Sequence, residues 1–218
     1  MFKVFVFGVM MVLCPFDGEA QWRLFVNFTP GVSIVAPAPL WVHQQEHSSL
    51  YQWAHYRSEP FEAPIYYSIR IGYTHVDKGW EIEMNHLKIY LQNTSDDLSR
   101  FSVSHGYNQL MVNRLLMKGS WVRKYGVGVV VAHPESTVRG LMYHESGGLF
   151  GAGYHIAGPV VQYGWSRDFI TRSVVYLTAS LMVSGAYARV PVVDGHADVP
   201  VVALHLQVGV GGQYRLRP

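Results

Sequence analysis

Apolar residues alternate with polar or small ones in segments about ten residues long, and this feature most limits how the 218-residue chain can fold. The segment that begins at Val202 shows the alternation most clearly, with apolar residues at even positions and small or polar residues at odd positions. Segments 174–190 and 64–74 repeat the pattern. A period of two predicts strands with one apolar face. After residue 20, no apolar run reaches the roughly 18 residues expected of a membrane-spanning helix.

The face opposite the apolar one is too poor in lysine and glutamate to be a water-exposed surface. Charged residues make up 15% of the chain, compared with about 25% in ordinary soluble domains. Several apolar stripes end in a tyrosine or tryptophan, as is typical at a membrane–water interface. These residues are Tyr73, Trp80, Tyr187 and Tyr214. We therefore predict an all-β fold, an eight-stranded antiparallel up-and-down transmembrane β-barrel. A soluble lipocalin-like barrel with its apolar faces inward is the alternative.

The count of alternating segments gives eight strands, an even number that suits a bacterial barrel whose interior is filled by side chains. The predicted strands cover about 22–29, 64–74, 79–91, 107–117, 121–132, 151–163, 173–190 and 201–216. Short connections at 76–78, 118–120 and 164–172 alternate with longer ones at 30–63, 92–106, 133–150 and 191–200. With both ends of the barrel domain in the periplasm, every long connection falls on the outer side, as expected of outer-membrane barrels.

The first twenty residues have the features of a secretory signal peptide. Lys3 provides the positively charged N-terminal region, and Val4 to Phe16 form the apolar region. The small residues of Gly18-Glu19-Ala20 suit cleavage before Gln21. The only cysteine, Cys14, lies within this segment. We predict a cleaved signal peptide over residues 1–20 and a barrel domain over 21–218, exported to the bacterial outer membrane; an N-terminal membrane anchor is the alternative. A net charge of +2 without a basic run predicts no nucleic-acid partner, and we expect a monomer.

Several polar residues alternate into the predicted interior of the barrel. We predict a structural lumen network that includes Arg70, Glu81, Glu83 and His205, with Arg70 paired to one of the two glutamates. Unpaired charges in a closed interior would be costly, so such a network is favoured over a catalytic pair of residues.

The long outer connections hold a second set of polar residues. His133, Glu135, His196 and Asp198 are the candidate catalytic residues, because histidines and carboxylates near one rim can exchange protons or hold a metal ion. His144-Glu145-Ser146 lies in the same region, and His43 and His47 form a further pair at helical spacing. In ordinary loops such residues simply face water.

One strand changes character toward its outer end. In segment 79–91 the face that carries Trp80 and Ile82 continues into His86, Lys88 and Tyr90. We predict that these three residues bind substrate at the level of the lipid headgroups, where long basic and aromatic side chains commonly lie. Ordinary anchoring at the membrane interface is the alternative.

Short motifs in a fixed order give a family resemblance. They are Phe61 to Tyr67, Gly79 to Tyr90, His105 to Val112-Asn113, Gly126 to Gly128, and His133-Pro134-Glu135. With them, residues 53–216 resemble the small outer-membrane barrels of Gram-negative bacteria described as lipid A oxidase-like.

The resemblance implies a barrel in the outer membrane that acts on or binds lipopolysaccharide. The activity it implies is oxidation of the proximal glucosamine of lipid A to an aminogluconate unit, with molecular oxygen as co-substrate and a divalent metal as a possible cofactor. It transfers no catalytic residues. A non-enzymatic structural or adhesive outer-membrane barrel is the alternative function.

Overall fold

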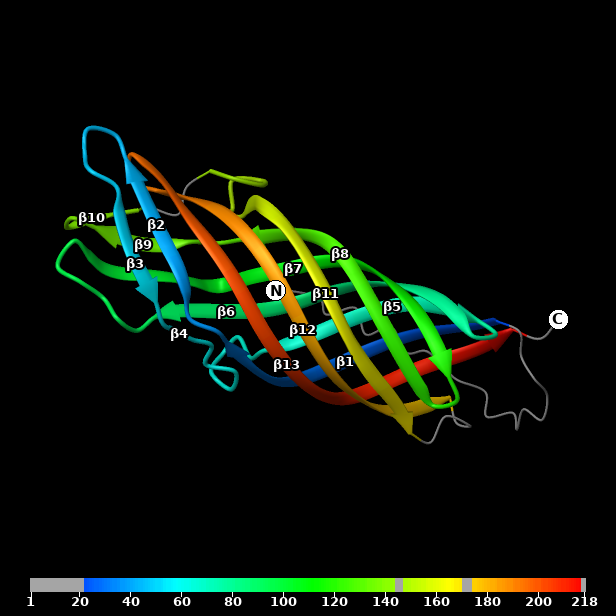
Figure 1. Ribbon diagram of the computed structural model, residues 1–218. Coiled ribbons are helices and arrows are strands. Elements are labelled where there is room, and N and C mark those ends of the chain that lie inside the picture. The colour runs from blue at the N-terminus through cyan, green and yellow to red at the C-terminus, as the bar shows by residue number, and fades with distance from the viewer. Residues whose placement is uncertain (1–21, 144–146, 170–173, 217–218) are drawn as a thin grey trace, which may run out of the picture.

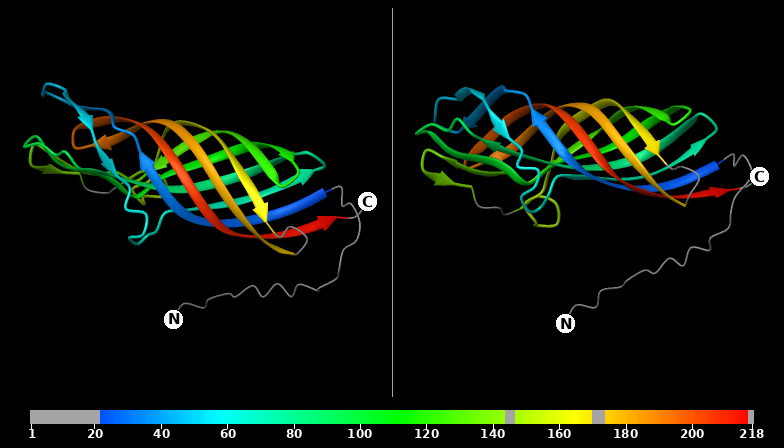
Figure 2. Two further views of the ribbon diagram at one scale, coloured as in Figure 1. Left: turned by 60° about the horizontal axis from the view of Figure 1, so that its bottom comes forward. Right: turned by 90° about the horizontal axis from the view of Figure 1, so that it is seen from below.

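The computed structural model describes residues 22–143, 147–169 and 174–216, so the predicted signal peptide and His144-Glu145-Ser146 lie outside the described residues. Eight long antiparallel strands form the wall of a closed barrel (Figures 1 and 2). In the order in which they pair around the ring, they are β1 (Trp22–Val35), β5 (Tyr67–His75), β6 (Lys78–Leu91), β7 (Leu98–Lys118), β8 (Trp121–Ala132), β11 (His155–Phe169), β12 (Val175–Val192) and β13 (Gly195–Leu216). Pairing of β13 with β1 completes the ring, which confirms the predicted fold class.

The apolar stripes of the strands face outward. On β13, Leu206 and Val208 are 52% and 59% exposed, while Gln207 between them is fully buried. The aromatic residues Tyr73, Trp80, Tyr187 and Tyr214 are also exposed on this outer surface. A closed ring of strands with an apolar exterior and a polar interior is the architecture of a transmembrane barrel, so the soluble alternative is wrong.

The strands extend further than the sequence pattern indicated, mainly at the end of the barrel that carries the long connections, which we call the outer end. The stretch 191–200, expected as a loop, belongs almost entirely to β12 and β13, which meet in a tight turn at Asp194. The stretch 164–172, expected as a short turn, continues β11 to Phe169. Likewise, β7 begins at Leu98 rather than near 107. Backbone hydrogen bonding continues where the outward faces cease to be apolar, so these extensions were missed.

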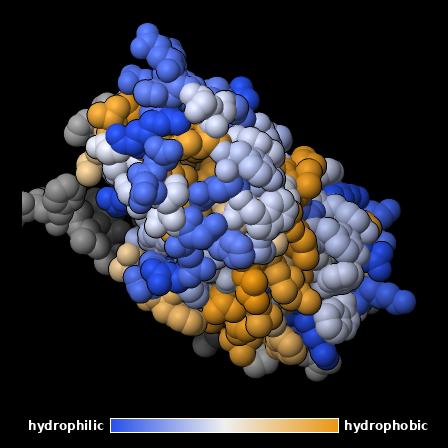
Figure 3. All heavy atoms as spheres, turned by 60° about the vertical axis from the view of Figure 1, so that its left-hand side comes forward, coloured by the Kyte–Doolittle hydropathy of each residue, from blue (hydrophilic) through white to orange (hydrophobic). Residues whose placement is uncertain are grey.

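Five short strands are added at the outer end. The expected loop 30–63 contains the end of β1 and then β2 (Ala38–Gln44), β3 (Leu50–Ala54) and β4 (Tyr56–Arg57), while 133–150 contains β9 (Glu135–Val138) and β10 (Leu141–Met142). In this extension β2 pairs with β13, β4 with β6, and β9 with β7. Figure 3 turns this end toward the viewer and shows hydrophilic residues gathered over it.

The described residues contain no helix that is long and apolar enough to cross a membrane.

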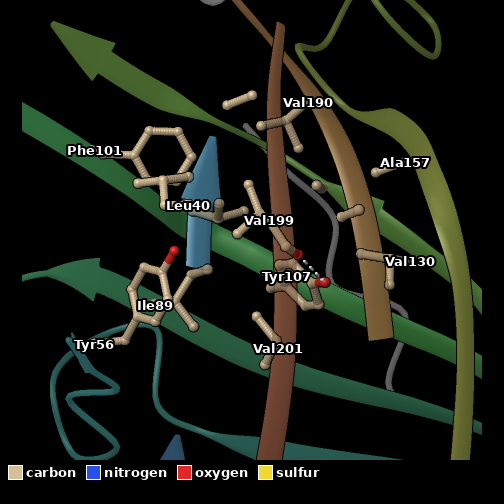
Figure 4. Close-up of a cluster of buried hydrophobic side chains, with 14 of the residues drawn as sticks. Leu40, Tyr56, Ile89, Phe101, Tyr107, Val130, Ala157, Val190, Val199 and Val201 are labelled. Carbon is tan, nitrogen blue, oxygen red and sulfur yellow. Dashed lines mark hydrogen bonds between the residues drawn. The ribbon is translucent and has the colours of Figure 1, made fainter. Parts of the chain in front are cut away.

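The barrel interior has two different fillings. Between the apolar stripes it is polar, with buried Arg70, Glu83 and Gln207. Toward the outer end it becomes a hydrophobic core, in which Ile89, Phe101, Val190 and Val199 converge from β6, β7, β12 and β13 (Figure 4). The Tyr107 hydroxyl donates a hydrogen bond across this core to the Val199 carbonyl, at 3.1 Å.

The change of filling coincides with a one-residue shift in the hydrophobic alternation. On β12 the odd-numbered Leu181 and Val183 face outward, whereas beyond Tyr187 the even-numbered Val190 and Val192 face inward. On β6 the outward Ile82 gives way to inward Ile89 in the same manner. The same strands therefore present apolar side chains to the surroundings in one half of the barrel and to the interior in the other.

Candidate functional site

The lumen network is centred on a fully buried ion pair. Arg70 Nε donates to Glu83 Oε1 at 3.0 Å, and both side chains are inaccessible to solvent. Arg70 also donates to Gln207 Oε1 and, at 3.2 Å, to the Ser180 hydroxyl. Ser68 donates to Glu83 Oε1 at 2.6 Å. The guanidinium and the carboxylate are thus both held by several partners, as a buried pair requires.

The remaining lumen residues continue this network along the barrel. Lys124 Nζ donates to Glu81 Oε1 at 2.7 Å, so Glu81 pairs with a lysine and Glu83 with the arginine. His205 lies between the Tyr66 hydroxyl and the Ser184 hydroxyl, each 2.8 Å from a ring nitrogen. The four residues predicted for a lumen network therefore all lie in it.

The network leaves little space in the lumen. A cavity of about 20 Å³ lies between Arg23, Glu81, Lys124 and Tyr176, in the half of the barrel away from the long connections. That is room for about one water molecule. Between the apolar stripes, the interior of the barrel is thus a packed polar plug.

The predicted substrate-binding residues on β6 do not face lipid. His86 is buried, stacks on Tyr67 with ring centroids 5.3 Å apart, and contacts Asn108 through Nδ1 at 2.7 Å. Lys88 is fully buried, and its Nζ donates to the Glu62 carbonyl at 2.9 Å. Tyr90 is half-buried beside β4. The predicted projection of Lys88 toward headgroups is wrong, because the segment before β5 covers this face of β6.

The four candidate catalytic residues do not form a single site. They divide between two groups, each joined by a histidine from another part of the chain. The β7 cluster consists of His105, His133 and Glu135, and the β13 cluster consists of His43, His196 and Asp198. Within each cluster one ligand-capable atom of every member lies within 4.8 Å of the others.

An irregularity in β7 creates the β7 cluster. Leu87 of β6 pairs with Tyr107, but Ile89 pairs with Val103, so residues 104–106 bulge from the ladder. Gly106 has φ +128°, and a Cβ atom there would lie 2.4 Å from the Asn108 amide. The bulge brings Ser104 and His105 beside β9, which carries Glu135.

Glu135 is the centre of the β7 cluster. Its Oε1 accepts a hydrogen bond from Ser104 and contacts His105 Nδ1 at 2.9 Å, while its Oε2 pairs with Arg100. Burial opposes the charged carboxylate, but the Ser104 hydrogen bond and the Arg100 charge outweigh it and lower the pKa of Glu135 below its usual value. Glu135 is therefore an anion with fixed partners.

His133, the third member of the β7 cluster, packs between two other rings. His133 is buried, and its ring centroid lies 4.9 Å from those of both His105 and Tyr154. Because Ser104 and His105 Nδ1 approach the same carboxylate oxygen, the histidine does not bridge the serine to the acid, and the geometry is not that of a hydrolytic relay. Two imidazoles and a carboxylate form instead a donor set that borderline divalent metals accept.

The β13 cluster lies on the outward wall at the outer end. His43 of β2 and His196 of β13 are cross-strand partners with ring centroids 4.9 Å apart. Asp198 accepts two hydrogen bonds from Arg189, at 2.7 and 3.1 Å. Although burial opposes ionisation, these bonds lower the pKa of Asp198. His43 Nδ1 lies 2.8 Å from the Ser49 hydroxyl, so most polar atoms of this cluster already have partners.

The sequence reasoning missed His105 and placed His43 in a different pair, with His47. Neither residue has a spacing that identifies its partners, because the bulge in β7 and the pairing of β2 with β13 bring them into place. One available signal was Asp194-Gly195 between alternating residues, since this dipeptide is typical of hairpin turns.

No family model matches the chain, and no curated protein matches it in sequence. Three solved structures have a similar shape. The outer membrane protein AlkL, in DMPC bilayers, is 12% identical over 95% of this chain and 97% of its own, with a TM-score of 0.48. Neisserial surface protein A is 11% identical over 91% and 100%, with a TM-score of 0.39. Ail, the attachment invasion locus protein of Yersinia pestis, is 9% identical over 90% and 100%, with a TM-score of 0.38.

The class of the protein rests on its own geometry. The closed eight-stranded ring, the apolar exterior and the polar interior define a β-barrel of the outer-membrane type. The resemblance to lipid A oxidase-like barrels stays a prediction.

Proposed function

We propose that the protein is a monomeric outer-membrane barrel that binds lipopolysaccharide in the outer leaflet through the outward wall of its outer end. The observation that carries this proposal is the end of the apolar stripes. Beyond the end of the stripes, the outward faces of β7 and β12 carry exposed polar side chains, namely Arg100, His105 and Arg189. Because a polar network fills the spanning part of the lumen, the proposal assigns binding to the outside of the barrel.

Two arginines are the proposed contacts to lipopolysaccharide phosphates. The side chains of Arg100 and Arg189 are 55% and 58% exposed, and each is anchored by a carboxylate, Glu135 or Asp198. A guanidinium held in this way keeps further N–H groups for a phosphate, which it can bind through two parallel hydrogen bonds. Tyr187 lies exposed beside Arg189 and can pack against sugar rings.

Binding can be tested with the refolded full chain and purified lipopolysaccharide. We expect Arg100→Gln combined with Arg189→Gln to weaken binding several-fold, and dephosphorylated lipopolysaccharide to bind weakly to the unmodified protein. The matched control is Arg114→Gln with Arg167→Gln, since these arginines lie at the periplasmic end beside Trp80 and Trp121. Equal binding by both double variants would contradict the proposal and favour a structural or adhesive barrel.

A second candidate function is oxidative modification of lipid A. The observation that favours it is the β7 cluster, which brings two histidines and a carboxylate together on the outer side. A bound divalent metal would supply the activation of molecular oxygen, while His105, His133 and Glu135 would hold it. His196 and Asp198 belong to the other cluster and are not part of this proposed site.

Mass spectra of lipid A test the enzymatic proposal directly. We expect lipid A from cells that express the protein to contain a form heavier by one oxygen atom, and this form to disappear with His133→Ala and persist with His196→Ala. Identical spectra with and without the gene would overturn the enzymatic proposal and leave the binding proposal standing.

A further inference from the structure

We propose that the β7 cluster is a binding site for one divalent transition-metal ion of borderline softness, such as Zn²⁺, Co²⁺ or Ni²⁺. The ligands are His105 of β7, His133, which directly follows β8, and Glu135 of β9. The inference does not depend on lipopolysaccharide binding or on oxidation of lipid A, because the site can hold a metal ion for either an enzymatic or a structural role.

The distances suit a metal site. Ligand atoms about 2.0–2.2 Å from one ion lie about 3 Å apart in tetrahedral or octahedral geometry. His105 Nδ1 and Glu135 Oε1 are already 2.9 Å apart, and a ring nitrogen of His133 lies within 4.8 Å of a ring nitrogen of His105 and of a carboxylate oxygen of Glu135. The His105 side chain is 56% exposed, so a small rotation of this ring can close the set around an ion.

The surroundings support the carboxylate ligand. Arg100 binds Glu135 Oε2, and Ser104 donates to Oε1, so the carboxylate is oriented with Oε1 toward His105. Such outer contacts fix ligand orientation in known metal sites. His155 is the cross-strand partner of Ala132, which precedes His133, and its buried Nε2 has no hydrogen-bond partner among the described residues.

The β13 cluster is a built-in control. It has the same residue types, two histidines and a carboxylate, but His43 Nε2 lies 3.7 Å from Asp198 Oδ2, and one guanidinium, that of Arg189, binds both oxygens of Asp198. A metal ion there would have to displace a bidentate ion pair. In the β7 cluster the corresponding separation is 2.9 Å and Arg100 pairs with Oε2 alone, so we predict that the β7 cluster binds metal more tightly.

The test is titration of the refolded full chain with Co²⁺ and Zn²⁺, followed by calorimetry and by the visible absorption of Co²⁺. We expect one ion per chain, a Co²⁺ spectrum with nitrogen ligation, and at least a tenfold loss of affinity in both His133→Ala and His105→Gln. His43→Gln and His196→Ala should bind like the unmodified chain.

His105→Gln changes a mostly exposed side chain, so it keeps the test valid if His133→Ala fails to fold. The inference is overturned if the unmodified chain binds no ion, if His105→Gln binds as tightly as the unmodified chain, or if the two β13-cluster variants are the ones that lose affinity. None of these outcomes bears on whether Arg100 and Arg189 bind lipopolysaccharide.

Discussion

The membrane-spanning half of the barrel and the half beyond it use the same strands with opposite sidedness. In the spanning half, Leu181 and Leu206 face outward and the interior holds Arg70 and Glu83. In the outer half, Val190 and Val199 face inward and form a hydrophobic core. The spanning half is thus apolar outside and polar inside, and the outer half is the reverse within the same hydrogen-bonded wall.

The difference follows from the solvent on each side. Lipid surrounds the spanning half, so burying apolar groups inside it gains little, and a hydrogen-bonded polar network fills the lumen. Water surrounds the outer half, so the hydrophobic effect draws apolar side chains into its interior. The position where the alternation shifts by one residue therefore indicates where the strands leave the bilayer.

The spanning half should be most sensitive to loss of a charge partner. Glu83→Ala leaves Arg70 buried without its carboxylate and should cost about 3–5 kcal/mol of unfolding free energy. Urea unfolding of the refolded barrel in lipid vesicles measures this. The combined variant Arg70→Met and Glu83→Gln removes both charges and should recover part of the lost unfolding free energy. If the combined variant is no more stable than Glu83→Ala, the plug is not held by charge pairing.

The outer half should instead be sensitive to cavities. Ile89→Ala empties part of a fully buried core position and should cost about 2–5 kcal/mol. Ile82→Ala, seven residues earlier on the same strand, is the control, because lipid fills the space left on the outside and no cavity forms. If both variants lose equal stability in vesicle unfolding, the outer half has no packed core of its own.

Arginine placed along the outward face of β12 should separate the two halves. Leu181→Arg puts a charge among the acyl chains and should cost about 2–4 kcal/mol, whereas Tyr187→Arg, next to the native Arg189, should cost about 0–1 kcal/mol. The same vesicle assay measures both. Equal costs would place the membrane boundary elsewhere on this strand.

The smallest expected effect concerns pH. The pKa of Asp198 is lowered in the folded protein, so its ion pair stabilises the outer half above the ordinary aspartate pKa, and this stability is lost as pH falls through the lowered value. Because Arg189 is more than half exposed, the contribution should be at most about 1 kcal/mol. Asp198→Asn should remove that part of the acid sensitivity, and an unchanged pH profile would show that the pair contributes no stability.

The alternation of the spanning half could be read from the sequence because one apolar face touches lipid along most of each strand. The strands of the outer half could not be predicted in this way. Their outward faces mix polar and apolar residues, and their apolar residues change parity, as at Val190 and Val199, so the pattern resembled that of a loop. The inward direction of Arg70 and Glu83 followed from parity alone. Parity does not predict which residues form the two clusters, because the bulge at Gly106 and the pairing of β2 with β13 depend on tertiary structure.

The reversal of sidedness is tested most directly by spin-label accessibility along β12. Single cysteines at 177, 181, 183, 189 and 190, in a chain with Cys14→Ser, would carry nitroxide labels in lipid vesicles. The labels at 177, 181 and 183 should favour collision with oxygen, which partitions into lipid, the label at 189 should favour a water-soluble nickel chelate, and the label at 190 should be shielded from both. Oxygen preference that continues to 189, or nickel access to 190, would contradict the account.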